Sequence, residues 1–341
     1  SPRSVRRRPT RFAAIVQLAA MAALVIPPGH AGAQGFARRG PLTTIDLSPR
    51  GIQGVAALPT VWTDYTAVSI NRLEIGSNIE VSGNFAVINS GGLLKLGTNL
   101  FHNSVPPDSF MAADNMEFTT GASANNVFVN NLVLNGTAEV RGTITSPYSF
   151  PLPIVQPPLP AGVNDACTAN ATDLTVTTAI SPKTITPGCY RDLDVKDGAV
   201  AELSGGSYIF RKILVEGSPA STGGQLVAVA ASVLAIQDTF VTEINSDVFP
   251  DSGDPADLEI YVKGVNNQIG NGSLNNPNSL FIGRIAAPND KNLQFGVRSV
   301  FVGNAFADEM FIFGVHLPRT PTPTPSPTPT PTPTPSPTPT R

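Results

Sequence analysis

A short rhythm of apolar side chains runs through this sequence. From Thr66 onward, two apolar residues separated by one other residue recur every five to seven positions, with Gly, Asn or Asp at many of the intervening turns. Such alternation turns one face of each strand toward a core and the other toward solvent. Strands this short are unstable alone, but stacked coils bury a continuous core. The rhythm predicts an all-β chain folded as a parallel β-helix with three short strands per coil, and we expect the termini outside it to be disordered.

The repeat has breaks that suggest how the chain is organised. The first pairs are Val68/Ile70, Leu73/Ile75, Ile79/Val81, Phe85/Val87 and Leu94/Leu96, so three pairs fill a circuit of about 18 residues. Residues 226–236 are consistent with either a buried strand pair or a short helix, and their β-branched content favours strands. We expect six parts: a signal peptide (1–33), an irregular segment (34–65), a first β-helix segment (66–145), a proline-rich linker or strap (146–162), a second β-helix segment (163–318) and a Thr/Pro-rich tail (319–341).

The linker and the tail are both rich in proline but differ in character. Proline removes sheet hydrogen-bond donors, so residues 146–162 are expected to be extended, and their apolar side chains favour packing on the solenoid surface. The tail alternates Thr or Ser with Pro and holds 10 of the 33 prolines. Its residues favour polyproline II and would extend about 65 Å at roughly 3.1 Å per residue. The tail is expected to be a stalk or spacer, or else an unmodified disordered segment.

The N-terminal residues have the features of an export signal. Five arginines precede an apolar run from Ala13 to Ile26, and the small-residue triplet at 31–33 follows. The run is short for a membrane span, which needs about 20 residues. We expect cleavage after Ala33, an exported protein at the cell surface or outside the cell, and no remaining transmembrane span. An anchor that is never cleaved is the alternative.

The charge of the chain restricts the partners that we expect, and its two cysteines suggest how it is cross-linked. Without residues 1–33 the chain has 17 basic and 25 acidic residues, which disfavours nucleic acid as a partner. In an oxidising compartment Cys167 and Cys189 are expected to form a disulfide, and two buried thiols are the alternative. A loop of this length would contribute about 3 kcal/mol.

Two phrases resemble a known group of domains. Residues 185–190, 193–199 and 203–210 resemble a repeated pattern of bacterial exported right-handed β-helix domains found in pilus-assembly-associated and surface proteins. Ice-binding-like exported domains are a more distant resemblance. Residues 283–289 resemble a phrase that often closes such domains. The resemblance implies a fold and a cell-surface setting, and it implies no catalytic residues.

Few residues suggest chemistry. Asp251, Asp254 and Asp257 form the best acidic cluster, which is either a weak calcium loop or an ordinary acidic turn. Asp192 and Asp194 would point outward from one strand, as paired carboxylates of a glycosidase or as a solvated face. His102 and His316 lie far apart in the sequence and fit packing or solvent positions.

We therefore expect no catalytic residues, no cofactor and no metal site beyond the weak calcium candidate. The leading interpretation is a non-catalytic exported solenoid with a structural, adhesive or assembly role, and with self-association or a cell-surface or glycan partner. The alternative is a carbohydrate-active enzyme or glycan-binding module on a β-helix scaffold.

Overall fold

A computed structural model describes residues 43–44, 57–103, 108–219, 222–271, 279–297, 299–313 and 315–316. These residues belong to the second of two compact units, Gly40–Arg341, which is described by itself. The expected signal peptide and Thr/Pro-rich tail lie outside the described residues. So do most of the irregular segment 34–65 and the termini expected to be disordered.

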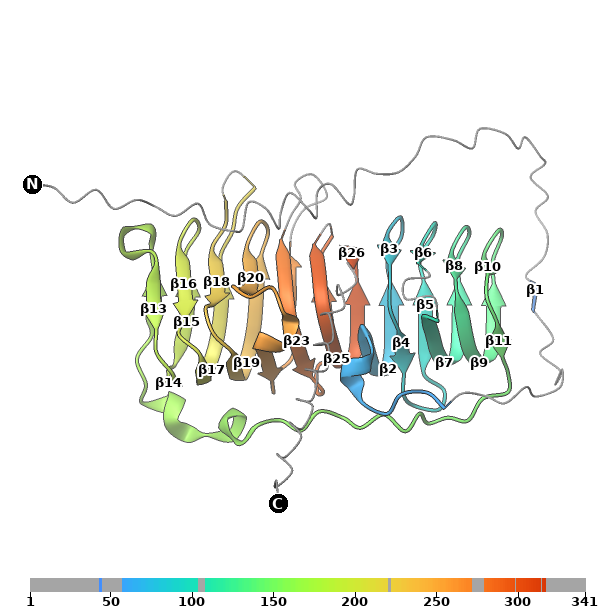
Figure 1. Ribbon diagram of the computed structural model, residues 1–341, viewed down its shortest axis with the longest axis horizontal. Helices are drawn as coiled ribbons and strands as arrows, with labels where there is room; N and C mark the ends of the chain where they lie inside the picture. The colour runs from blue at the N-terminus through green and yellow to red at the C-terminus, as the bar shows by residue number, and fades with distance from the viewer. Residues whose placement is uncertain are drawn as a thin grey trace, which may run out of the picture. The chain divides into compact units, whose positions relative to one another are not determined.

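The chain winds into a parallel β-helix whose coils stack side by side (Figure 1). Each full coil contributes to three sheets. The first sheet contains β14 (Gly188–Cys189), β17 (Gly206–Val215), β19 (Ser232–Glu243), β21 (Leu258–Val262), β23 (Leu280–Ala287), β25 (Val300–Ile312), β2 (Ala67–Ile75), β4 (Phe85–Val87), β7 (Phe110–Phe118), β9 (Asn126–Leu134) and β11 (Ile144–Thr145).

The six longest of these strands turn a corner and continue into the second sheet. The second sheet therefore contains the later parts of β17, β19, β25, β2, β7 and β9, together with β12 (Leu174–Val176), β15 (Asp192–Val195), β22 (Gln268–Asn271), β24 (Leu293–Phe295) and β5 (Leu93–Leu96). In β17 the ladder shifts between Phe210 and Lys212, which marks this corner. The short β1 (Thr43–Thr44) pairs antiparallel with β9.

The third sheet closes each coil. On one side it contains β13 (Lys183–Ile185), β16 (Val200–Leu203), β18 (Gln225–Ala228), β20 (Asp247–Pro250), the first parts of β23 and β25, and β26 (Val315–His316). On the other side β3 (Glu80–Val81), β6 (Phe101–His102), β8 (Ser123–Ala124) and β10 (Glu139–Val140) form a separate four-stranded sheet.

The order of coils in space differs from their order in the sequence. The chain enters at β2, in the middle of the stack, and winds outward to β11 (Figure 1). It then runs back along the solenoid and winds inward from β12 to β25. There β25 pairs in parallel with β2, with Leu73 opposite Met310 and Ile75 opposite Ile312. We call this meeting of the first and last coils the junction.

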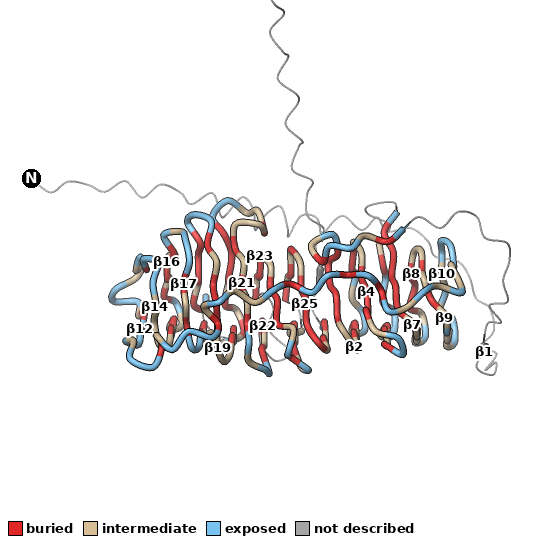
Figure 2. Tube along the Cα trace, turned by 90° about the horizontal axis from the view of Figure 1, so that it is seen from below, coloured by how far each residue is buried: buried red, intermediate tan, exposed pale blue. Residues whose placement is uncertain are grey.

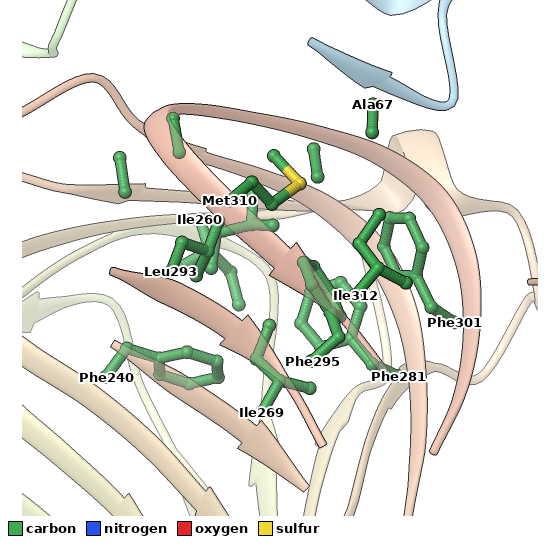
Figure 3. Packing of buried hydrophobic residues seen from close by; sticks show 14 of the residues in the cluster. Ala67, Phe240, Ile260, Ile269, Phe281, Leu293, Phe295, Phe301, Met310 and Ile312 are labelled. Atoms are coloured by element: carbon green, nitrogen blue, oxygen red, sulfur yellow. The ribbon is translucent and has the colours of Figure 1, made fainter. Parts of the chain in front are cut away.

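Apolar side chains fill the solenoid from end to end. At equivalent inward positions Ala67 is paired with Phe85, and Phe85 with Met111. Near the junction aromatic rings fill the interior (Figure 3), with the centroids of Phe295 and Phe301 4.5 Å apart. Burial of such side chains against each other is the main stabilising contribution.

A second apolar cluster lies outside the first sheet. Outward side chains that most solenoids would expose are buried there: Ala286, Phe306, Val68, Ala86 and Ala112. Leu152 and Ile154 from residues 146–155 cover them, together with Trp62 from the entering segment. We call residues 146–165, which include these two side chains, the strap. The strap follows the solenoid in both views (Figures 1 and 2). Its backbone is tied to the first sheet by the Leu152 amide, which donates to the Ile88 carbonyl at 2.9 Å.

Short 3-10 helices lie at the strap and at turns. They are η1 (Trp62–Asp64), η2 (Ala161–Asn164), η3 (Ala166–Ala169), η4 (Thr178–Ile180) and η5 (Pro255–Asp257). A disulfide joins Cys167 in η3 to Cys189 in β14, with 6.2 Å between the Cα atoms. It ties the end of the strap to the outermost coil, and the predicted disulfide is confirmed.

The predicted parallel β-helix is confirmed as well. Residues 226–236 form strands, as their composition indicated. Asparagines at some turns bond from coil to coil, with Asn99 donating to Asn78 at 3.1 Å. Within the ranges described above, no helix has the length and apolarity needed to cross a membrane.

Candidate functional site

A shallow open groove lies on the second sheet at the junction. It has a volume of about 420 Å³ and is lined by Glu74, Ile75, Gly76, Ser77, Lys95, Gly97, Thr98, Thr119 and Phe313. These residues come from β2, β5 and the turns after them, from the residue after β7, and from the residue after β25. Because β25 belongs to the last coil in the sequence and β2 to the first, the groove lies where these two coils meet.

The wall of the groove is built from hydroxyl residues of successive coils. By register Ser77 is equivalent to Thr98, whereas Thr119 is equivalent to Gly97, one position earlier in its coil. The Ser77 hydroxyl accepts from the Thr98 amide at 2.9 Å, and the hydroxyls of Thr98 and Thr119 lie 3.3 Å apart. Neighbouring strands are about 4.8 Å apart. The groove therefore carries a row of hydroxyls that follows the solenoid axis.

Glycines keep the floor of the groove low. A Cβ on Gly97 would lie 2.4 Å from the carbonyl carbon of Gly76, so the two coils approach too closely for a side chain there. A Cβ on Gly76 would lie 2.9 Å from the ring of Phe313. These glycines are explained first by coil packing, and the hollow is its consequence.

Phe313 forms the aromatic edge of the groove. Its amide donates to the Phe295 carbonyl at 2.8 Å, which continues the ladder beyond β25. Its side chain is 38% exposed. Two residues earlier, Phe311 lies on the same outward side and is partly covered by the Arg72 guanidinium, 6.0 Å from the ring centroid. Neither ring is part of the hydrophobic core.

The charges around the groove are balanced. Glu74 accepts from Arg72 Nε at 2.9 Å, and Lys95 Nζ lies 3.6 Å from Glu117 Oε1. Glu74 is the single carboxylate among the lining residues. Hydrolysis of a glycosidic bond ordinarily uses two carboxyl groups that flank it. The lining of the groove therefore lacks the carboxyl pair that such hydrolysis uses.

In the structure, the two carboxylates that the sequence suggested as a pair contact different cations. Asp192 accepts from Arg211 Nε at 2.8 Å, and Asp194 forms an ion pair with Lys196 at 2.7 Å. A similar contact joins Asp173 to Arg191, and it lowers the pKa of Asp173. Each of these carboxylates has its own cation on the surface of the second sheet, and none of them lines the groove.

The acidic loop is built as a turn. The Asp254 carboxylate accepts from the Ala256 amide at 3.0 Å and begins η5, and Asp257 accepts from the Ser252 hydroxyl at 2.6 Å. Asp251 precedes this turn after β20. Across the part of the chain that the structure describes, no group of three or more His, Cys, Asp or Glu is placed to hold a metal.

His102 and His316 have separate positions. His102 is fully buried in β6, and His316 lies in β26 of the last coil. The His102 Nε2 lies 2.8 Å from the Gly83 carbonyl, and Nδ1 accepts from the Asn125 amide at 3.2 Å. Burial lowers the pKa of His102 to about 4. Both ring nitrogens link successive coils, which gives His102 a packing role.

Sequence reasoning missed the groove. Phe313 stood there only as the end of the apolar rhythm, and an alternating pattern does not show which side of the last strand it occupies. The available signal was a hydroxyl residue shortly after each of three strands: Ser77, Thr98 and Thr119. Threonine does not recur along the second-sheet row that begins at Thr175, which continues with Asp194, Leu214 and Val241.

Comparisons with known proteins find similarity in structure alone. No protein-family model matches the sequence, and no curated protein matches it. An ice-binding protein from an Antarctic biological consortium is 14% identical, with a TM-score of 0.34, over 80% of this chain and 96% of that one. The DUF3494 domain of Shewanella frigidimarina ice-binding protein 1 is 12% identical, with a TM-score of 0.36, over 75% and 94%.

A glycosylated ice-binding protein from an Arctic yeast is 13% identical, with a TM-score of 0.34, over 77% of this chain and 94% of that one. The more distant of the two sequence resemblances, to ice-binding-like domains, thus has structural counterparts. The resemblance to pilus-assembly domains has no support from these comparisons. At such identities and TM-scores, the similarities say nothing about what this chain binds.

Proposed function

We propose that this chain is a non-catalytic exported solenoid that serves a structural or adhesive role at the cell surface or outside the cell. The observation that carries the proposal is the contrast between two sheets. The strap buries the outward residues of the first sheet, whereas the outward residues of the second sheet remain partly or fully exposed beside the groove. A chain that covers one of its own faces and leaves another bare has a surface available for contact.

The arrangement of charges supports a role without catalysis. Carboxylates on the second sheet are neutralised by cations from the same or a neighbouring coil, as in Lys196, which contacts both Asp194 and Glu216. Such pairs tie coils together, and Glu74 is the one carboxylate among the residues that line the groove. Catalytic carboxyl groups would instead converge on one pocket with pKa values set apart from each other.

Export is supported by the disulfide and by the sequence of residues 1–33. Disulfides form and persist mainly in oxidising compartments. The chain leaves the described solenoid at His316, in the central coils beside β3. A Thr/Pro-rich tail joined at this place would act as a tether that leaves both ends of the stack free. This supports the structural role that the tail composition suggests.

The second candidate is a glycan-binding module, and the groove favours it. The groove combines an exposed aromatic ring, a row of hydroxyls and a single paired carboxylate. Ligand sites typically combine apolar and aromatic surface with a few placed polar groups.

Fractionation of producing cells tests the proposal. The protein is expected in the medium or on the outer surface, where protease added to intact cells degrades it. Purified protein immobilised on beads is expected to retain cells, while beads carrying an unrelated acidic protein do not. Recovery in the cytoplasm, or equal retention by both kinds of bead, would contradict it.

A further inference from the structure

We propose that the junction groove binds an uncharged polysaccharide chain that lies along the solenoid axis, with Phe313 as the stacking platform. This rests on the proposed adhesive role and names the ligand class for it. The occupant is argued from three properties of the groove: its direction, its hydroxyls and aromatic ring, and its charge.

The direction of the groove favours an elongated ligand. Its wall is made by hydroxyl residues of successive coils, Ser77, Thr98 and Thr119, and its edge by Phe313 of the coil before them. Four coils at about 4.8 Å per step extend roughly 14 Å along the axis. A row of hydroxyls along this axis presents hydrogen-bonding groups to successive units of a polymer.

The ring and the hydroxyls together match a sugar. The ring of Phe313 is placed by its backbone bond to Phe295 and remains 38% exposed. The face of an aromatic ring is electronegative and packs favourably on the polarised C–H face of a pyranose. Serine and threonine hydroxyls both donate and accept hydrogen bonds, as sugar hydroxyls do.

The balanced charges around the groove favour a neutral glycan over a charged ligand. Glu74 pairs with Arg72, and Lys95 lies near Glu117, so neither sign prevails over the groove. A nucleic acid or an acidic polysaccharide would need a surplus of cations. A single carboxylate that already accepts from arginine lacks the second carboxyl for hydrolysis, so the chain is bound and left intact.

Three variants test the assignment. Phe313→Ala removes the platform, Phe313→Trp keeps it, and Phe101→Ala is the matched control, because Phe101 is 43% exposed on the third sheet. Circular dichroism and urea unfolding would first confirm that all three fold as the parent does. The parent and the variants would then be measured by pull-down on insoluble cellulose and chitin, and by calorimetry with soluble neutral β-glucan and dextran.

At least one of these glycans is expected to bind, with Phe313→Ala weakening the affinity about tenfold and Phe101→Ala leaving it unchanged. The Trp variant is expected to retain binding. Loss through Phe101→Ala alone, equal binding by Phe313→Ala, or no binding to any of the four glycans would overturn the inference. A dimer in sedimentation that Phe313→Ala dissociates would also overturn it, because a second copy would then occupy the groove. Bead retention of cells that persists in Phe313→Ala would leave the adhesive role standing while the groove assignment fails.

Discussion

Ala67 in β2 lies directly opposite Ala305 in β25, although the two are 238 positions apart in the chain. The pairing joins the first coil to the last and makes one stack from two runs, one that winds outward from β2 and one that winds inward to β25. Asn304 reinforces it by donating to the Tyr65 carbonyl at 2.7 Å. The junction thereby brings Phe313 beside Gly76 and creates the groove.

The strap is expected to contribute to stability through its buried residues only. Leu152 is 3% exposed against the first sheet, and Leu152→Ala should lower the free energy of unfolding by about 2–5 kcal/mol. Val155, three residues on, is 68% exposed, and Val155→Ala should change it by less than about 0.5 kcal/mol. Urea unfolding measures both. Equal effects would show that the strap does not pack as described.

Asp247 is expected to make the fold less stable as pH rises. Burial raises the pKa of Asp247 to about 6, although the Leu280 amide donates to its carboxylate at 3.1 Å. Between the unfolded pKa near 3.9 and about 6 the folded state holds the extra proton, so stability falls as pH rises through this window. Asp247→Asn keeps an acceptor and should stabilise the protein by up to roughly 3 kcal/mol at pH 8. At pH 4 the variant and the parent should be alike. A stabilisation that is independent of pH would refute the protonation account.

His102 should have the opposite effect and make the fold less stable as pH falls. Its buried neutral ring accepts from the Asn125 amide at Nδ1, and protonation would remove that acceptor. Because burial lowers its pKa to about 4, the unfolded state binds the proton first, and stability is lost as pH falls from about 6.5 toward 4. NMR titration in the Asp247→Asn background separates the two groups. A His102 resonance that titrates near 6.5 would contradict the buried position.

The disulfide should stabilise one end of the solenoid. Replacing Cys167 and Cys189 together by serine should cost about 3 kcal/mol in the chain-entropy model. Hydrogen exchange is expected to quicken in β12, β14 and β15, while β4, β7 and β9 stay protected, because the bridge ties η3 to the outermost coil. Uniform acceleration through all coils would show that the bridge holds the whole fold and not its end.

The sequence allowed the local structure to be predicted, but not the order of the coils. Alternation at Leu73 and Ile75 shows which side chains face the core, because a strand has a period of two. It does not show that Met310 and Ile312 are their neighbours, since every coil presents the same kind of edge. The strap was expected from its prolines, whereas its course over Phe306 depends on packing between distant residues. Asp192 and Asp194 were predicted to point outward, but their cations could not be identified without the register.

Cysteine cross-linking across the junction tests the central relationship most directly. Arg72 in β2 and Glu309 in β25 are register partners with outward side chains, and adjacent strands lie about 4.8 Å apart, within reach of a disulfide. Oxidation of the Arg72→Cys/Glu309→Cys protein should give a bond between these positions in peptide mapping. Arg72→Cys/Asn131→Cys, with two strands between the sites, should give none. Efficient cross-linking of the first pair alone is the result we expect. Cross-linking of both pairs, or failure of the first pair in folded protein, would contradict the junction.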